Sequence, residues 1–124
     1  MTTDVLLLCD DLLFASKVTG TAQAHALQAV VVRTPAELRC QRAQLQPRCI
    51  IVDLQHRGLD IAALLRDPPE APPTRFIAFG SHVDAAALHA ARAAGCDLAL
   101  PRSAFVERLE AELLDWCAPV NSTS

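Results

Sequence analysis

Short apolar runs alternate with amphipathic stretches along this chain of 124 residues. The apolar runs have the length of strands, and the stretches between them repeat apolar residues at helical spacing. Strands are predicted at 4–9, 29–32, 49–52, 76–79 and 98–100. Helices are predicted at 12–27, from Thr34 to Pro47, at 60–65, at 84–94 and at 104–117. The pattern therefore predicts five strand–helix units in succession.

Residues with special backbone preferences mark the ends of several elements. Thr34 followed by Pro35 is typical of a helix N-terminus, because threonine caps the helix and proline is tolerated in its first turn. Gly95 follows the Ala-rich helix at a position that favours a left-handed residue. Gly20 is the weak point of the first helix, where glycine costs about 1 kcal/mol relative to alanine. The proline-rich segment 67–73 is predicted to be a surface loop.

The predicted order of elements defines a fold class. The strand at 49–52 is apolar at every position, which is typical of a central parallel strand covered on both faces. Strands and helices that alternate at this spacing predict a parallel sheet with helices on both sides. For five units the usual strand order is the flavodoxin-like 2-1-3-4-5. We therefore expect a single doubly wound (βα)5 domain over residues 1–118, with a polar tail at 119–124.

Composition narrows the class of protein. The net charge is −3 and the 11 basic residues are scattered, so the sequence carries no basic footprint for nucleic acid. No apolar run reaches the length of a membrane span, and no basic region precedes the first apolar run as in a signal peptide. The five cysteines form no CxxC pair, which favours buried free thiols in a reducing compartment. We expect a cytoplasmic protein that contacts neither membrane nor nucleic acid.

Candidate chemistry lies directly after four of the apolar runs. The residues at these points are Asp10 and Asp11, Asp53, Gly80 and Ser81, and Arg102. The carboxyl ends of parallel strands form one edge of the sheet, so these points are expected to converge there. Three carboxylates in one pocket repel each other unless a cation neutralises them, and Mg²⁺ takes such oxygen ligands. The alternative is that each acid is only a turn former or a helix cap.

Three segments of the chain resemble the receiver domains of bacterial response regulators. These segments are Leu6-Leu7-Leu8-Cys9-Asp10-Asp11, Cys49-Ile50-Ile51-Val52-Asp53-Leu54 and Ala94-Gly95-Cys96-Asp97. The first is similar to the family's acidic pair, the second to the strand that ends in the phosphoacceptor aspartate, and the third to the turn before the fifth strand. Arg102 falls where the family has an invariant lysine. The resemblance extends from about Val5 to Trp116.

The resemblance implies a mechanism and a set of partners. A histidine kinase would donate a phosphoryl group to Asp53. Mg²⁺ would be held by Asp11, Asp53 and the backbone carbonyl of Gln55, with Asp10 acting through a water. Phosphorylation would then change which partner binds a face made by the last two strands and helices. The helix at 84–94 and strand five lie on the face that receivers use to dimerise, which indicates a homodimer.

The chain departs from the receiver pattern at the residues that read out phosphorylation. Gly80 replaces the family's serine or threonine, and Ser81 is one step further, where a strand residue faces the opposite side unless the backbone bends. Ala99 replaces the switch aromatic and has no ring to move. The guanidinium of Arg102 is a wide planar fork, which we expect to pair with Asp53 or Asp10 and to block the site.

These departures predict an atypical or pseudo-receiver. The preferred interpretation is a stand-alone signalling module that acts through protein–protein interaction and catalyses, at most, its own phosphotransfer and dephosphorylation at Asp53. One alternative is a phosphorylatable response regulator served by a histidine kinase. Another is a small Mg²⁺-dependent phosphohydrolase, which would need a substrate cleft.

Two further sets of residues lie close to the predicted edge. Leu12, Leu13 and Phe14 follow the acidic pair, and we expect two of the three to pack into the core. Otherwise they form an apolar docking patch beside the site. His56 and His82 lie in loops at the same edge and can approach the pocket, although the chain's histidines lack metal-ligand spacing.

Overall fold

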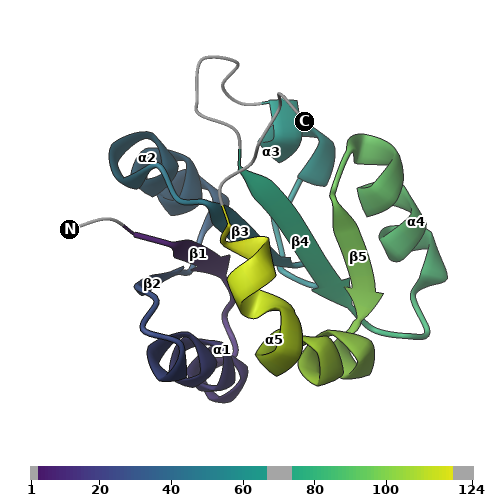
Figure 1. The fold of residues 1–124 in the computed structure, drawn as a ribbon. Coiled ribbons are helices and arrows are strands. Elements are labelled where there is room, and N and C mark those ends of the chain that lie inside the picture. Colours follow the sequence, from purple (N-terminus) through teal and green to yellow (C-terminus); the bar gives the residue numbers. More distant parts are fainter. Residues whose placement is uncertain (1–2, 67–73, 119–124) are drawn as a thin grey trace, which may run out of the picture.

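The computed structural model describes residues 3–66 and 74–118, so the predicted loop 67–73 and the predicted tail 119–124 lie outside it. Five parallel strands form one sheet in the order β2-β1-β3-β4-β5, as predicted (Figure 1). The strands are β1 (Val5–Leu8), β2 (Ala29–Val32), β3 (Cys49–Asp53), β4 (Arg75–Gly80) and β5 (Leu98–Pro101). The helices are α1 (Leu12–Ala24), α2 (Pro35–Leu45), α3 (Ile61–Arg66), α4 (Ala85–Ala94) and α5 (Arg102–Trp116).

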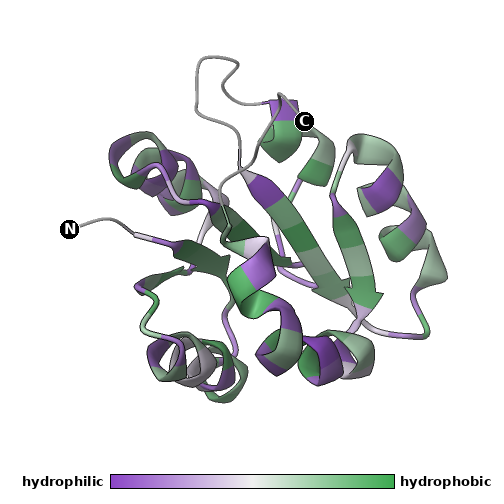
Figure 2. Ribbon diagram, viewed as in Figure 1, coloured by the Kyte–Doolittle hydropathy of each residue, from purple (hydrophilic) through white to green (hydrophobic). Residues whose placement is uncertain are grey.

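The sheet separates two apolar cores, one on each face. Helices α1 and α5 cover one face, and α2, α3 and α4 cover the other (Figure 1). Side chains of a strand alternate between the two sides, so Val5 and Leu7 enter the α1–α5 core while Leu6 and Leu8 enter the opposite core. The strands are accordingly mostly hydrophobic, apart from the start of β4 at Arg75, and the helices alternate hydrophobic and hydrophilic residues (Figure 2). Burial on both faces explains why the strands read as continuous apolar runs.

A column of aromatic rings fills the α1–α5 core. The ring of Phe79 in β4 lies 4.6 Å from that of Phe14 in α1 and 4.9 Å from that of Phe105 in α5, measured between centroids. Phe105 in turn lies 5.7 Å from Trp116. Such separations are typical of favourable aromatic pairs. The column fixes the first turns of α1 and α5 beside the end of β4, where the candidate residues lie.

Most predicted boundaries agree with the structure within one or two residues, and the differences have local causes. Helix α1 ends at Ala24 rather than at residue 27, because Ala26 adopts a left-handed conformation with φ of 58°. The predicted caps are confirmed: Thr34 accepts a hydrogen bond from the backbone of Glu37, and Gly95 has a φ of 114°. Helix α5 begins at Arg102 instead of residue 104, directly after β5.

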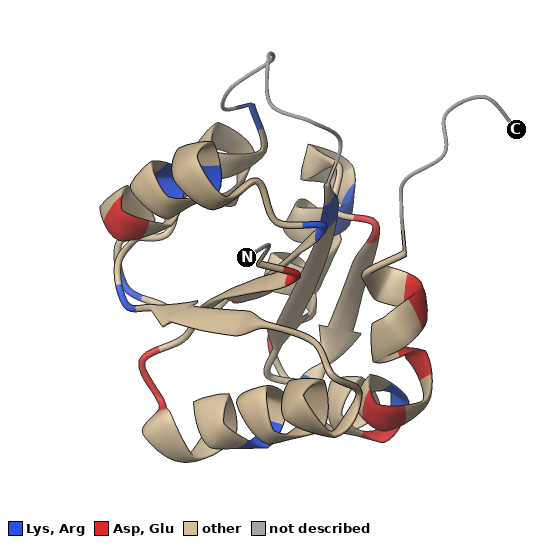
Figure 3. Ribbon diagram, turned by 60° about the vertical axis from the view of Figure 1, so that its left-hand side comes forward, with Lys and Arg blue, Asp and Glu red and all other residues tan. Residues whose placement is uncertain are grey.

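The structure also shows where the cysteines and the charged residues of the described chain lie. Cys9, Cys49, Cys96 and Cys117 are buried, Cys40 is exposed, and all five are free thiols. Basic and acidic residues are spread over several elements (Figure 3). No helix of the described residues is long and apolar enough to cross a membrane.

Candidate functional site

The central carboxylate of the site is Asp53. It is the last residue of β3, where the register of the sheet pairs it with Phe79, and it is only 7% exposed. Its Oδ1 accepts a hydrogen bond of 2.9 Å from the backbone N–H of Gln55. Its Oδ2 lies 4.0 Å from Sγ of Cys9. Burial raises the pKa of Cys9, and the charge of Asp53 adds to this, while Sγ also lies 3.5 Å from the backbone carbonyl of Asp11, to which the thiol can donate.

Asp11 has two roles at the same edge. Its Oδ1 caps α1 by accepting hydrogen bonds of 3.1 Å from the backbone N–H groups of Leu13 and Phe14. Its Oδ2 points away from the helix end and lies 3.5 Å from Nη1 of Arg102. One oxygen of this side chain therefore caps the helix, as the helix-cap alternative expects, and the other faces Arg102.

Arg102 lies between the two carboxylates. Its Nη2 is 3.7 Å from Oδ2 of Asp53, while its Nη1 faces Asp11. The guanidinium carbon lies 4.5 Å from the ring centroid of Phe14 and 5.4 Å from that of Phe79. A cation above an aromatic face is attracted to it by about 0.5–2 kcal/mol. The first residue of α5 thus carries a positive charge into the space that Asp11 and Asp53 share, with aromatic rings supporting it.

Asp10 lies apart from this pair. Its Oδ2 is 3.2 Å from Nε2 of His56, and its side chain is 62% exposed. The His56 side chain is only 6% exposed, and its Nε2 also contacts the backbone carbonyl of Arg33. Nε2 therefore carries the hydrogen, and Nδ1 is buried without a hydrogen-bond partner. His56 was predicted to approach the pocket. It contacts Asp10 and the loop after β2 instead and does not line the cavity beside Arg102, whereas His82, for which the same was predicted, does line it.

The donor set offers limited support for a metal ion. Within residues 3–66 and 74–118, no three His, Cys, Asp or Glu side chains are arranged to hold one. Mg²⁺ needs only one or two carboxylates and keeps several waters, and Asp11 Oδ2 and Asp53 Oδ2 share one space. The Arg102 guanidinium occupies that space. These residues can hold Mg²⁺ only if Arg102 moves out.

Gly80 and Ser81 follow the neighbouring strand. A Cβ on Gly80 would lie 3.4 Å from Cβ of Leu54 and 3.7 Å from Leu88, which is ordinary contact distance. Strand β4 ends at Gly80, and Ser81 begins a turn in which its carbonyl accepts a hydrogen bond from the N–H of Asp84. Because the strand alternation stops there, Ser81 lines the same cavity as Arg102. The backbone bend that the sequence argument required is present.

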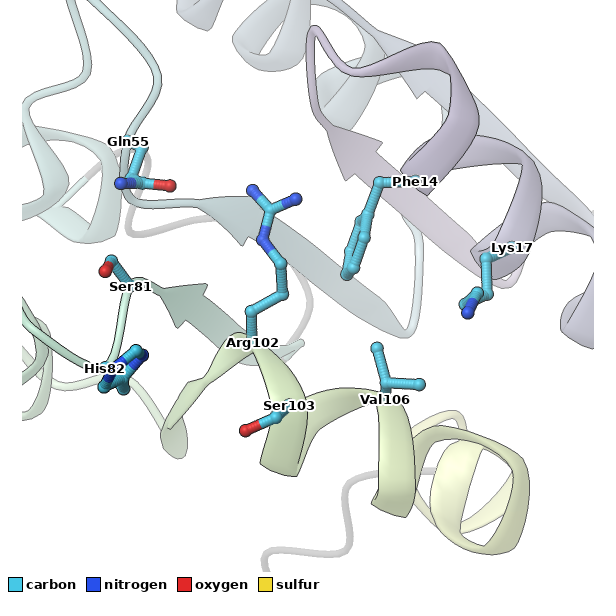
Figure 4. Close-up of a pocket in the computed structure, with 8 residues that line it drawn as sticks. All are labelled: Phe14, Lys17, Gln55, Ser81, His82, Arg102, Ser103 and Val106. Atoms are coloured by element: carbon cyan, nitrogen blue, oxygen red, sulfur yellow. The ribbon is translucent and has the colours of Figure 1, made fainter.

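A cavity of about 510 Å³ opens beside the carboxylates (Figure 4). Phe14 and Lys17 line it from α1, and Arg102, Ser103 and Val106 line it from α5. The loops after β3 and β4 complete the lining with Gln55, Ser81 and His82. Sequence reasoning did not single out Lys17, because its spacing in the helix does not reveal that α5 lies opposite.

The apolar residues after the acidic pair differ from expectation. Leu12 is 59% exposed and Leu13 is 86% exposed, and only Phe14 is buried. The prediction that two of the three pack into the core is therefore wrong. Helix α1 begins at Leu12 because Asp11 caps it there. With this starting point, the helix directs Phe14 to the core and both leucines to the solvent. They form an exposed apolar surface beside the site.

Comparison with known proteins defines the class of fold. The sequence matches no protein-family model and no curated protein sequence. The structure is similar to a response regulator receiver domain from Bermanella marisrubri, with a TM-score of 0.79, 18% identity and coverage of 94% of this chain and 98% of that one. A putative response regulator from Chloroflexus aurantiacus J-10-fl gives a TM-score of 0.80 at 18% identity, covering 95% and 99% of the two chains.

A third solved structure extends this comparison. The Mn²⁺-bound form of response regulator Rcp1 gives a TM-score of 0.76 at 12% identity, covering 98% of this chain and 99% of that one. The chain therefore has the flavodoxin-like fold of response regulator receiver domains.

Proposed function

We propose that the protein is a receiver-type signal-transduction module that acts by binding other proteins and whose phosphorylation switch is degenerate. The observation that carries the proposal is the position of Arg102 between Asp11 and Asp53. A phosphoryl acceptor carboxylate must be neutralised before it can approach an anionic phosphoryl group. Here the guanidinium neutralises Asp53 in the resting protein but also lies in the space through which a phosphoryl group would have to approach.

The contacts of Asp53 support a blocked acceptor. One of its oxygens accepts the Gln55 N–H and the other faces the guanidinium. An incoming phosphoryl group needs a carboxylate oxygen with an open line of approach. The position of Arg102 over Phe14 and Phe79 favours a guanidinium that stays in place. Phosphorylation would have to displace it.

The readout residues support the same conclusion. Gly80 has no hydroxyl with which to hold a phosphoryl oxygen. The hydroxyl of Ser81 already accepts a hydrogen bond from the N–H of Val83, 3.3 Å away. Ala99 is 2% exposed and has no ring that could move between two positions. Without a bistable element, a charge change at Asp53 has no route to the β5 surface.

The proposal includes weak binding of Mg²⁺ at the acidic site. The ligands would be Asp11, Asp53 and the Gln55 carbonyl, with Asp10 acting through a water. A bound Mg²⁺ would supply charge neutralisation at Asp53. Rcp1, which shares the fold, has been solved in a Mn²⁺-bound form. Arg102 competes for the same carboxylate oxygens, so we expect weak binding that strengthens when Arg102 is replaced.

The proposed partners are a histidine kinase or another signalling protein, which the module binds in the cytoplasm. Leu12 and Leu13 offer an exposed apolar surface beside the acidic site. Helix α4 and the edge strand β5 offer a second surface, through which we propose that a homodimer forms. A phosphorylatable response regulator is the second candidate, because Asp53 keeps the acceptor position at the end of β3.

One experiment separates these candidates. Beryllofluoride and Mg²⁺ are added to the ¹⁵N-labelled protein, and amide shifts are followed by NMR in wild type, in Asp53→Asn and in Arg102→Lys. The proposal expects no response in wild type and a response around residue 53 in Arg102→Lys, whose compact ammonium leaves room. Wild-type shifts that spread from Asp53 to β5 and are absent in Asp53→Asn would establish the working regulator instead. Turnover of phosphate esters that Asp53→Asn abolishes would identify a phosphohydrolase.

A further inference from the structure

The cavity between α1 and α5 shares Arg102, Gln55 and Ser81 with the proposed acidic site, and its other side, formed by Phe14, Lys17 and Val106, has no role in that function. We propose that it binds a small organic anion, a carboxylate carried on an aromatic or alkyl body. This proposal goes beyond the signalling role and needs no phosphorylation of Asp53. It depends on the charge, the free donors and the apolar wall of the cavity.

Two cationic side chains, Lys17 and Arg102, line the cavity, and the carboxylates of Asp11 and Asp53 lie against Arg102 only. The chain has a net charge of −3 and a single lysine, Lys17. That lysine lines the cavity together with Arg102, and no carboxylate side chain is among the residues that line it. Lys17 is exposed, and no ion pair of the described residues involves it. An exposed ammonium without an ion-pair partner is available to an anion at little desolvation cost.

Arg102 retains hydrogen-bonding capacity toward the cavity. Its contacts with Asp11 and Asp53 are 3.5 and 3.7 Å long, whereas a tight charge-assisted hydrogen bond measures about 2.7–2.9 Å. A guanidinium has five N–H donors. Nη1 and Nη2 make one carboxylate contact each here, to Asp11 and to Asp53. The side chain is 35% exposed. The guanidinium can therefore donate a hydrogen bond to an external anion while it stays beside Asp53.

The remaining lining selects an organic anion over an inorganic one. Phe14 and Val106 form an apolar wall next to the two cations (Figure 4). The hydroxyl of Ser103 adds a donor at the start of α5, where no side chain caps the helix. The volume of about 510 Å³ lies within the range of small-molecule sites. Inorganic phosphate would pair with the two cations and leave Phe14 and Val106 exposed to water. An aryl carboxylate would pair with the cations and also cover these apolar side chains.

The test uses 1-naphthoate as the probe, with the uncharged 1-naphthalenemethanol and inorganic phosphate as comparisons. Each is titrated into the ¹⁵N-labelled full chain, and amide shifts are followed by NMR. We expect saturable shifts at Lys17, Ser103 and Val106 with a Kd on the order of 1 mM, as for a ligand of this size. The alcohol and phosphate should bind at least several-fold more weakly. Equal binding of either comparison, or shifts that do not saturate, would overturn the proposal.

Two variants and a matched control locate the site. Lys17→Gln, which preserves helix propensity at an exposed position, should weaken naphthoate binding by roughly fivefold. Val106→Glu, which adds a like charge inside the cavity, should abolish saturable binding. Arg66→Gln removes an exposed cation at the end of α3 and should leave the Kd unchanged. The proposal fails if Lys17→Gln and Arg66→Gln bind naphthoate equally, or if only a partner protein and no small anion perturbs these amides.

Discussion

Nη2 of Arg102 lies 3.7 Å from Oδ2 of Asp53, and the same guanidinium reaches Asp11. The pairing joins the first residue of α5 to the last residue of β3 across the carboxyl edge of the sheet. A buried carboxylate without a counter-charge costs several kcal/mol, so Arg102 stabilises the fold as well as occupying the site.

Replacing Arg102 should destabilise the protein and increase its response to Mg²⁺. Arg102→Ala leaves Asp53 buried without a cation, which we expect to cost about 1–2 kcal/mol, because the arginine is partly exposed. Millimolar Mg²⁺ should restore part of this loss in the variant and change wild type little. Urea unfolding with and without Mg²⁺ measures both effects, with Arg66→Ala as control. An equal Mg²⁺ effect on wild type and Arg102→Ala would show that the guanidinium and the metal do not compete.

A hydroxyl can be returned to the end of β4 at little cost. The Cβ of Gly80→Ser would meet Leu54 at 3.4 Å and Leu88 at 3.7 Å, both ordinary contacts. The free energy of unfolding should therefore change by less than about 1 kcal/mol. Denaturant titration measures it. A loss above about 3 kcal/mol would mean that Leu54 cannot accommodate the side chain.

The aromatic column and the exposed leucine should differ sharply in their contribution to stability. Phe105→Ala removes a fully buried ring that stacks on Phe79 and Trp116, which should cost about 3–5 kcal/mol. Leu13→Ala, at a side chain 86% exposed, should change stability by less than about 0.5 kcal/mol. Both are measured by urea unfolding. A substantial loss in Leu13→Ala would mean that the leucine is covered, for example in a dimer, and stability would then depend on protein concentration.

Alkaline pH should weaken the fold through Cys96. Burial, with a smaller effect from Asp97, raises the pKa of this thiol from its ordinary 9.0 to about 12. Above pH 9 the unfolded chain releases the proton while the folded chain keeps it, so stability falls as pH rises toward 12. The loss should reach about 1 kcal/mol near pH 10. Unfolding measured from pH 7 to 10.5 should show a flatter profile for Cys96→Ala, whereas the exposed Cys40→Ala should follow wild type.

The fold could be predicted because its determinants are local. The apolar run at 49–52 specified a strand covered on both faces, and Thr34 and Gly95 specified helix ends that the structure confirms. The end of α1 was missed because Ala26 takes a left-handed backbone conformation, which the residue type alanine does not predict. The exposure of Leu12 and Leu13 was missed because a helix of this composition offers more than one apolar face.

The order of elements, the parallel sheet and the edge that holds Asp10, Asp11, Asp53 and Arg102 could be read from the chain, because periodicity and capping act over a few residues. The pairing of these residues depends on three-dimensional packing. Arg102 contacts Asp11 and Asp53 while Asp10 contacts His56. Those choices depend on where α5 begins and on aromatic rings packed from distant segments, and contacts across such separations leave no local pattern in the chain.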